Sequence, residues 1–188
     1  MKSVVIFASG SGSNAERIVK EHHQKNFNVS CVYCNNSKAG VIQKMQHLNI
    51  PVVVFSKKEL MEPEFTLNLL SQNIDLIVLA GFLLHIPSYL IQAFPNQIVN
   101  IHPSLLPKYG GHGMYGMKVH ESVIENNEST SGITIHYVND MYDEGQIIQQ
   151  FELEVEKSDT AETLAEKIHI LEHTHFGPTI LKILNHEL

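Results

Sequence analysis

Short apolar runs alternate along the first half of the chain with longer segments in which apolar residues recur at helical spacing. The apolar runs are rich in Val, Ile, Leu and Phe and are predicted to be strands: residues 3–8, 29–33, 51–55, 75–80 and 97–101. The segments between the first four runs are predicted to be helices: residues 14–25, 39–48 and 58–72. Strands of near-continuous apolar residues separated by helices are buried on both faces. The pattern therefore predicts an α/β fold with a doubly wound, mostly parallel, Rossmann-like sheet and helices on both faces.

The pattern changes after Pro103. A loop rich in Gly, Tyr and Met (108–117) leads to a short helix that ends near Asn127. Two strands follow, at residues 132–138 and 146–153, and the connection between them is too short for parallel strands. We therefore expect an antiparallel edge on this side of the sheet.

The last segment is predicted to be a helix that begins at Asp159, because Glu162, three residues later, would complete a capping box. Its buried face is expected to consist of apolar residues at helical spacing: Ala161, Leu164, Ile168 and Leu171. The chain contains no repeat, low-complexity tract or linker. The whole chain, residues 1–188, is thus expected to be a single domain.

Composition narrows the possible partners. The formal net charge is −7, whereas a nucleic-acid surface needs a clustered excess of Lys and Arg. No stretch approaches the roughly 20 apolar residues of a membrane span. The apolar run near the N-terminus leads into glycines rather than a signal-peptide cleavage site. We expect a cytoplasmic protein that binds small molecules and neither nucleic acid nor membrane.

Cys31 and Cys34 form a C-x-x-C pair, which is typical of redox and metal sites. Both lie in a predicted strand, however, where residues three apart point to opposite faces. We interpret them as buried strand residues.

A glycine loop, Gly-Ser-Gly-Ser-Asn, ends at Asn14 between the first strand and the first helix. Unpaired N–H groups and a partial positive charge at a helix start suit a phosphate, so Gly12, Ser13 and Asn14 are candidate phosphate ligands. The loop also fits a dinucleotide fingerprint, but Asn35 and Asn36 stand where NAD binding needs an acidic residue. The alternative is a tight turn without a ligand.

Asn100 and His102 lie two residues apart at the end of the fifth predicted strand and therefore share a face. Open α/β sheets bind ligands at the carboxyl ends of their strands. An Asn amide and a protonated His can together hold a developing oxyanion, and the His can also transfer a proton. The alternative is a capped strand end with solvated polar groups.

The run Asn-Ile-His-Pro-Ser-Leu-Leu-Pro at residues 100–107 closely resembles the signature of the folate-dependent formyltransferases. Three further segments resemble the family in the same order along the chain: the glycine loop, Leu-Ala-Gly-Phe at 79–82, and residues 132–148 with Asp-Glu-Gly at 143–145. The resemblance covers nearly the whole chain, and an eight-residue match with three ordered partners is highly specific.

The resemblance implies a reaction and its participants. The formyl donor would be 10-formyltetrahydrofolate as co-substrate, and the acceptor would be the amine of glycinamide ribonucleotide, a step of de novo purine biosynthesis. Asn100 and His102 would hold and protonate the tetrahedral intermediate, and Asp143 would pair with His102 and favour its imidazolium form. No metal is implied, and the protein would be a monomer or a weak homodimer.

The resemblance also implies binding residues. Glu172 would accept hydrogen bonds from the ribose hydroxyls of the acceptor. Folate would lie against residues of two loops together with the end of the fifth strand: Leu83, Leu84, His85, Ile86, Asn100, Asn139, Asp140, Met141, Tyr142 and Asp143.

Three alternatives stay open. The run from His169 to His173 fits the zinc motif H-x-x-E-H, although no convincing third ligand follows it. Formyltetrahydrofolate hydrolases share the Asn, His and Asp residues but carry a regulatory domain in front. A non-catalytic nucleotide-binding module would keep the glycine loop without needing Asn100, His102 and Asp143 together.

Overall fold

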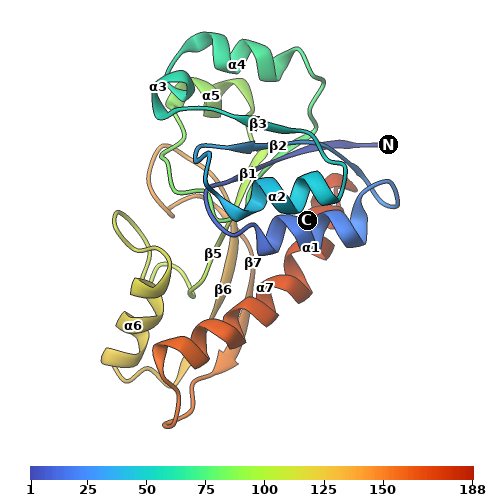
Figure 1. Ribbon diagram of the computed structural model, residues 1–188. Coiled ribbons are helices and arrows are strands. Elements are labelled where there is room, and N and C mark those ends of the chain that lie inside the picture. The colour runs from blue at the N-terminus through green and yellow to red at the C-terminus, as the bar shows by residue number, and fades with distance from the viewer.

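Seven strands form one sheet in the computed structural model, which describes residues 1–188 (Figure 1). Their order across the sheet is β3-β2-β1-β4-β5-β6-β7. The strands, in chain order, are β1 (Ser3–Ala8), β2 (Asn28–Cys34), β3 (Val52–Val54), β4 (Leu76–Leu79), β5 (Ile98–His102), β6 (Thr130–Tyr137) and β7 (Ile147–Glu154). Strands β1 to β5 pair in parallel, whereas β6 is antiparallel to both β5 and β7. The predicted mostly parallel sheet with an antiparallel edge is confirmed.

Helices cover both faces of this sheet (Figure 1). They are α1 (Ser13–His22), α2 (Gly40–His47), α3 (Lys57–Leu60), α4 (Pro63–Leu70), α5 (Ser88–Ala93), α6 (Met117–Glu125) and α7 (Ala161–Leu184). The apolar core on one face includes residues of α1, α2, α6 and α7, and the core on the other face includes residues of α3, α4 and α5.

Strand β1 shows how one apolar run serves both cores. Val4 and Ile6 pack into the first core, Val5 and Phe7 pack into the second, and all four are fully buried. Successive side chains of a strand point to opposite faces, so a strand at the centre of a two-faced sheet must be apolar at every position. This is the physical reason for the near-continuous apolar run.

The predicted single helix over residues 58–72 is wrong. The chain forms α3 and α4 instead, with Pro63 at the start of α4. Glu62, which precedes the proline, has an extended backbone (φ −92°, ψ 135°), because the proline ring disfavours helical geometry in the residue before it. Helix α5, which follows β4, was not predicted from the sequence.

The last helix begins two residues later than predicted. Its N-cap is Thr160, whose hydroxyl accepts a hydrogen bond from the backbone N–H of Thr163, while the Thr163 hydroxyl accepts one from the N–H of Thr160. Asp159 instead accepts hydrogen bonds from Lys167 and from the backbone of Glu156. Of the predicted buried face, Leu164 and Ile168 are buried, whereas Ala161 and Leu171 are half-buried.

Cys31 and Cys34 are both buried and unpaired, and they pack into opposite cores. The interpretation as strand residues is confirmed. None of the helices is both long enough and apolar enough to cross a membrane.

Candidate active site

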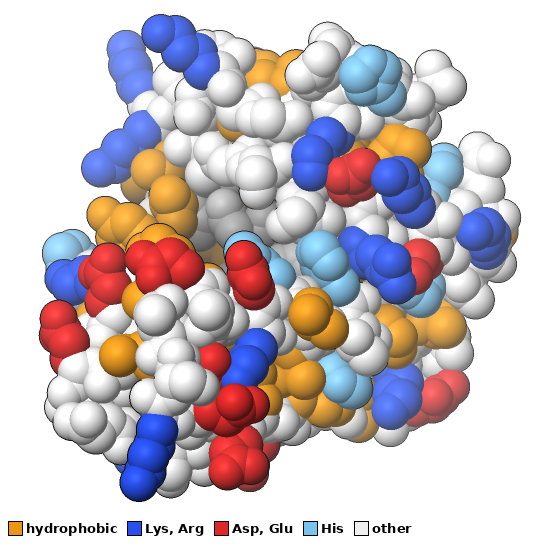
Figure 2. Space-filling model, turned by 60° about the horizontal axis from the view of Figure 1, so that its bottom comes forward, with side chains coloured by type: hydrophobic (Ala, Val, Ile, Leu, Met, Phe, Trp, Pro, Cys, Tyr) orange, Lys and Arg blue, Asp and Glu red, His pale blue; other side chains and the backbone are white.

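A cleft of about 340 Å³ opens at the carboxyl ends of the parallel strands. Its walls are segments that are far apart in the sequence: the loop at 10–14, residues 80–83 after β4, the end of β5 at 100–103, the loop at 111–116, Tyr142 with Asp143, and one face of α7. The surface in Figure 2 is hollowed, with carboxylates and histidines beside the hollow. The position and size are those expected of a ligand site in an open α/β sheet.

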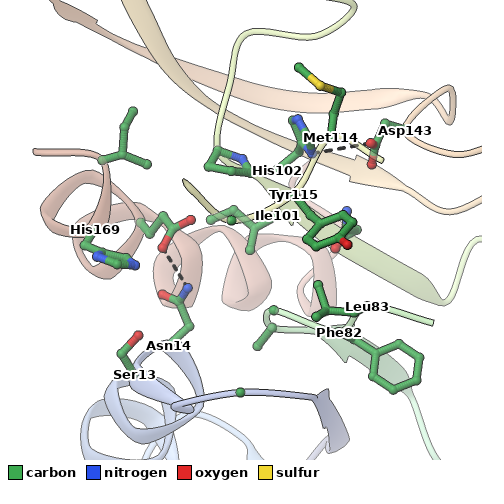
Figure 3. Close-up of a pocket in the computed structure, with 18 of the residues that line it drawn as sticks. Ser13, Asn14, Phe82, Leu83, Ile101, His102, Met114, Tyr115, Asp143 and His169 are labelled. Carbon is green, nitrogen blue, oxygen red and sulfur yellow. Dashed lines mark hydrogen bonds and ion pairs between the residues drawn. The ribbon is translucent and has the colours of Figure 1, made fainter. Parts of the chain in front are cut away.

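The glycine loop leads directly into α1. Gly12 is the N-cap of this helix and has a left-handed backbone (φ 72°). No side chain caps the helix start, so the first N–H groups of α1 remain available to a ligand. Gly12, Ser13 and Asn14 all line the cleft, where these N–H groups and the helix dipole favour an anion. Figure 3 shows Ser13 and Asn14 at this end of the cleft.

Gly12→Ala should lower the free energy of unfolding by about 1–3 kcal/mol. A Cβ atom at this position would lie 2.4 Å from Cγ2 of Val41, and alanine disfavours the positive φ. Gly10→Ala is the matched control, because a Cβ there meets nothing within 4 Å. Urea unfolding of both variants checks this expectation, and equal midpoints would contradict it.

Helix α7 contributes a buried carboxylate to the same end of the cleft. Oε2 of Glu172 accepts a hydrogen bond from Nδ2 of Asn14 at 2.9 Å, although the two residues are 158 positions apart. Only 6% of Glu172 is exposed, and this burial raises the pKa of its carboxyl. The second carboxyl oxygen has no protein partner, so Glu172 can accept a hydrogen bond from a ligand hydroxyl.

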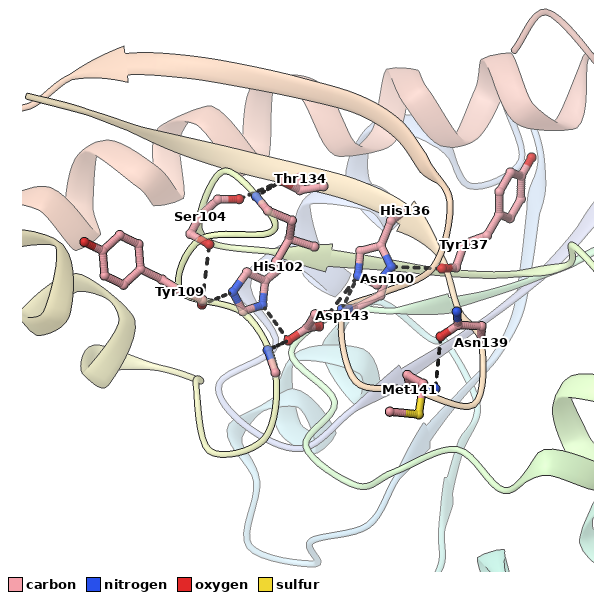
Figure 4. A network of polar contacts seen from close by, with 12 residues as sticks. Asn100, His102, Ser104, Tyr109, Thr134, His136, Tyr137, Asn139, Met141 and Asp143 are labelled. Atoms are coloured by element: carbon pink, nitrogen blue, oxygen red, sulfur yellow. Dashed lines mark hydrogen bonds and ion pairs between the residues drawn. The ribbon is translucent and has the colours of Figure 1, made fainter. Parts of the chain in front are cut away.

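At the other side of the cleft, His102 lies between two acceptors. Its Nε2 is 2.7 Å from the carbonyl oxygen of Tyr109, and its Nδ1 is 3.4 Å from Oδ2 of Asp143 (Figure 4). Carbonyl and carboxylate oxygens accept hydrogen bonds and do not donate them. Nε2 therefore carries the hydrogen that the Tyr109 carbonyl accepts, and Nδ1 faces the Asp143 carboxylate.

Asp143 is held in place by the loop opposite it. Its Oδ2 accepts a hydrogen bond from the backbone N–H of Gly111 at 2.9 Å, and its backbone φ is 58°. Asp tolerates this left-handed conformation better than most residues. The carboxylate is thus fixed between β5 and the loop at 111–116.

Asn100 completes the group from the same strand as His102. Its Nδ2 lies 3.1 Å from Nε2 of His136 on β6, and that ring nitrogen lies 3.7 Å from Oδ1 of Asp143. Four polar side chains from two strands and one loop therefore meet at one edge of the cleft (Figure 4).

Two of the lining histidines, His102 and His120, are buried, and His169 lies near Ser13 and Asn14 (Figure 3). No Lys or Arg lines the cleft. The pKa of His120 is lowered to about 4, mainly because burial disfavours its charged form. His120 therefore adds no fixed positive charge, whereas the N–H groups at the start of α1 are available to an anion.

The two loops implicated in folate binding flank this cleft, but only part of each faces it. Leu83, Tyr142 and Asp143 line the cleft. Among the other residues of these loops, Ile86 packs into the second core, and Nε2 of His85 lies 3.0 Å from the carbonyl oxygen of Asp140. The remaining members lie outside the lining: Leu84, Asn139 and Met141.

His136 was not singled out from the sequence, although the same reasoning that found Asn100 and His102 would have found it. Thr134 and His136 alternate with isoleucines on β6, just as Asn100 and His102 alternate with apolar residues on β5. The register pairs Thr134 with His102 and His136 with Asn100. His120 gave no comparable signal, because a single histidine on a short helix has no periodic partner.

The zinc motif in α7 does not assemble a metal site. The rings of His169 and His173 are 6.3 Å apart, and Glu172 between them points to Asn14. No group of three His, Cys, Asp or Glu side chains is arranged so that it could hold a metal ion.

Comparison with known proteins identifies relatives over almost the whole length. Residues 1–180 match the family described as Formyl transferase. A chloroplastic phosphoribosylglycinamide formyltransferase of Arabidopsis thaliana is 40% identical over 92% of this chain, which spans 62% of that plant protein. The phosphoribosylglycinamide formyltransferase of Bacillus subtilis is 36% identical over 98% of this chain and 95% of its own length.

Solved structures show the same likeness in three dimensions. The crystal structure of a phosphoribosylglycinamide formyltransferase from Anaplasma phagocytophilum has a TM-score of 0.89 and 33% identity, and the match covers 98% of this chain and 87% of that one. The sheet order, the antiparallel edge and the helical layers therefore follow an architecture already seen in relatives.

Proposed function

This chain belongs to the formyl transferase family, and we propose that it transfers the formyl group of 10-formyltetrahydrofolate to the amine of glycinamide ribonucleotide. The observation that carries the proposal is the arrangement of the cleft. An anion-binding helix start lies at one end, and His102, Asp143 and Asn100 lie at the other. The names of the relatives at 36% and 40% identity support this acceptor.

The acceptor would bind with its phosphate on the N–H groups at Gly12, Ser13 and Asn14. Its ribose hydroxyls would donate to the free carboxyl oxygen of Glu172. The amine of the glycinamide part would then point toward β5. Glu172 and Asn14 are hydrogen-bonded to each other, so the residues proposed to bind the phosphate and the ribose hold each other in place.

The folate would enter from the side of the two loops that flank the cleft. Leu83 and Tyr142 provide apolar and aromatic surface there, and both are substantially exposed (53% and 39%). The other proposed folate residues would act through the backbone of the same loops or by supporting it. The formyl group would then lie beside Asn100 and His102.

The reaction needs a hydrogen-bond donor to the formyl oxygen and two proton transfers, one from the attacking nitrogen and one to the leaving nitrogen. Attack of the acceptor amine on the formyl carbon forms a C–N bond and places negative charge on the formyl oxygen. Asn100 Nδ2 and the His102 imidazolium would donate hydrogen bonds to that oxygen. Collapse of the intermediate breaks the bond to the folate nitrogen, which takes up a proton, while the attacking nitrogen loses one.

His102 can assist only by exchanging one of its present bonds. Its two nitrogens now face the Tyr109 carbonyl and the Asp143 carboxylate. The exchange would occur at the bond to Tyr109, because Asp143 is proposed to stay paired with His102. That bond lies next to the loop at 111–116, which lines the cleft.

The test is a spectroscopic assay of deformylation of 10-formyltetrahydrofolate, with and without glycinamide ribonucleotide. We expect deformylation that requires the ribonucleotide and produces its formylated form, unaffected by a chelator in a parallel reaction. Deformylation without the ribonucleotide would indicate a hydrolase instead. No deformylation under either condition would contradict the proposal.

A further inference from the structure

Asn100 and His136 face each other across two antiparallel strands, paired in register. The contact between Asn100 Nδ2 and His136 Nε2, at 3.1 Å, is the only hydrogen bond of the Asn100 side chain. An Asn amide has two orientations, related by exchange of its oxygen and nitrogen, that fill nearly the same space. The hydrogen-bonding state of His136 Nε2 therefore decides which orientation Asn100 adopts.

The backbone fixes that state. Nδ1 of His136 lies 2.9 Å from the carbonyl oxygen of Tyr137, and because a carbonyl only accepts, Nδ1 carries the hydrogen. The ring is 2% exposed, and this burial lowers the pKa of His136. A neutral ring with its hydrogen on Nδ1 leaves a lone pair on Nε2, which accepts from Asn100.

Two charged groups on neighbouring elements affect the protonation of the His136 ring. The Asp143 carboxylate, 3.7 Å from Nε2, favours protonation of His136, whereas a positive His102 opposes it. Since Asp143 also accepts the N–H of Gly111 and pairs with His102, its charge is largely compensated. Burial therefore keeps His136 neutral.

We propose that His136 is a positioning residue that locks the Asn100 amide with its nitrogen toward β6, leaving the second N–H of Nδ2 to donate to the formyl oxygen. This rests on the proposed function. A ring protonated at Nε2 would instead donate, Asn100 would turn its oxygen toward it, and the position that needs a donor would present an acceptor.

The kinetic test compares His136→Phe and His136→Gln in the native background and in Asn100→Ala. Phe fills the space of the ring but accepts no hydrogen bond, so kcat should fall about 100-fold while KM for both substrates stays unchanged. Gln offers an acceptor oxygen and should recover part of that loss. In the Asn100→Ala background, His136→Phe should lower kcat little further, because the amide that His136 positions is absent.

A loss of the same size in both backgrounds would overturn the proposal, since it would show that His136 acts on something other than Asn100. Urea unfolding separates this from misfolding, and the ring-nitrogen measurement described next tests the proposal if the Phe variant does not fold.

Nuclear magnetic resonance of the ring nitrogens gives a readout that does not depend on activity. We expect His136 to carry its hydrogen on Nδ1 and not on Nε2 at neutral pH, and the opposite tautomer would overturn the proposal. If the protein transfers no formyl group, the proposed function fails, whereas this measurement still reports whether the lock on Asn100 exists.

Discussion

His102→Ala should reduce kcat about 1,000-fold, with the protein still folded. The side chain is 4% exposed and is the only proposed donor in the cleft that can carry both a positive charge and a transferable proton. Alanine removes both, whereas Asn100 and the substrate contacts remain. Steady-state kinetics with the ribonucleotide varied at saturating folate would measure the effect.

The control for lost packing is His102→Gln, which keeps a neutral donor and most of the side-chain volume. We expect the kcat of His102→Gln to be close to that of His102→Ala, because glutamine supplies no proton. Added imidazole should restore part of the activity to the alanine variant alone. Native turnover in His102→Ala would remove His102 from the mechanism.

Asp143→Asn should lower kcat about 100-fold. An Asn at this position can still accept the N–H of Gly111, so the loop keeps its anchor, but the negative charge beside Nδ1 of His102 is lost. Without that charge, the imidazolium loses its ion pair, although a neutral acceptor oxygen remains beside Nδ1. The same steady-state assay measures the loss.

Glu144→Gln is the matched control, because Glu144 lies in the same loop, its side chain is exposed, and it is not among the proposed catalytic or folate-binding residues. The control should retain native kcat. If both variants lost activity equally, the charge of the loop as a whole, rather than the pairing with His102, would be responsible.

The fold was largely predictable from the sequence, because buried strands leave continuous apolar runs in it. A central strand such as β1 has no exposed face, so its apolar run is continuous and easily found. The errors fell where local chemistry competes with that signal. Pro63 ends one helical pattern and starts another, and Thr160, rather than Asp159, caps the last helix.

The site was predictable where its residues are neighbours in sequence. Asn100 and His102 show a period of two on one strand, and that pattern alone indicated an oxyanion site. Other contacts of the site join residues that are far apart in the sequence. Asn100 contacts His136, 36 residues away, and Asn14 contacts Glu172, 158 residues away. Those contacts follow from strand register and helix docking, which no local pattern specifies.

The position of β1 in the middle of the sheet has a consequence for synthesis on the ribosome. Strands β1 to β3 pair with neighbours in sequence and can associate early, but the other edge of β1 stays open until β4 has emerged. The loop at Gly12 is made directly after β1, whereas Glu172 arrives with α7, after every strand. A nascent chain therefore exposes an unpaired, apolar edge of β1 until β4 has been made, and it cannot complete the cleft until α7 has followed the last strand.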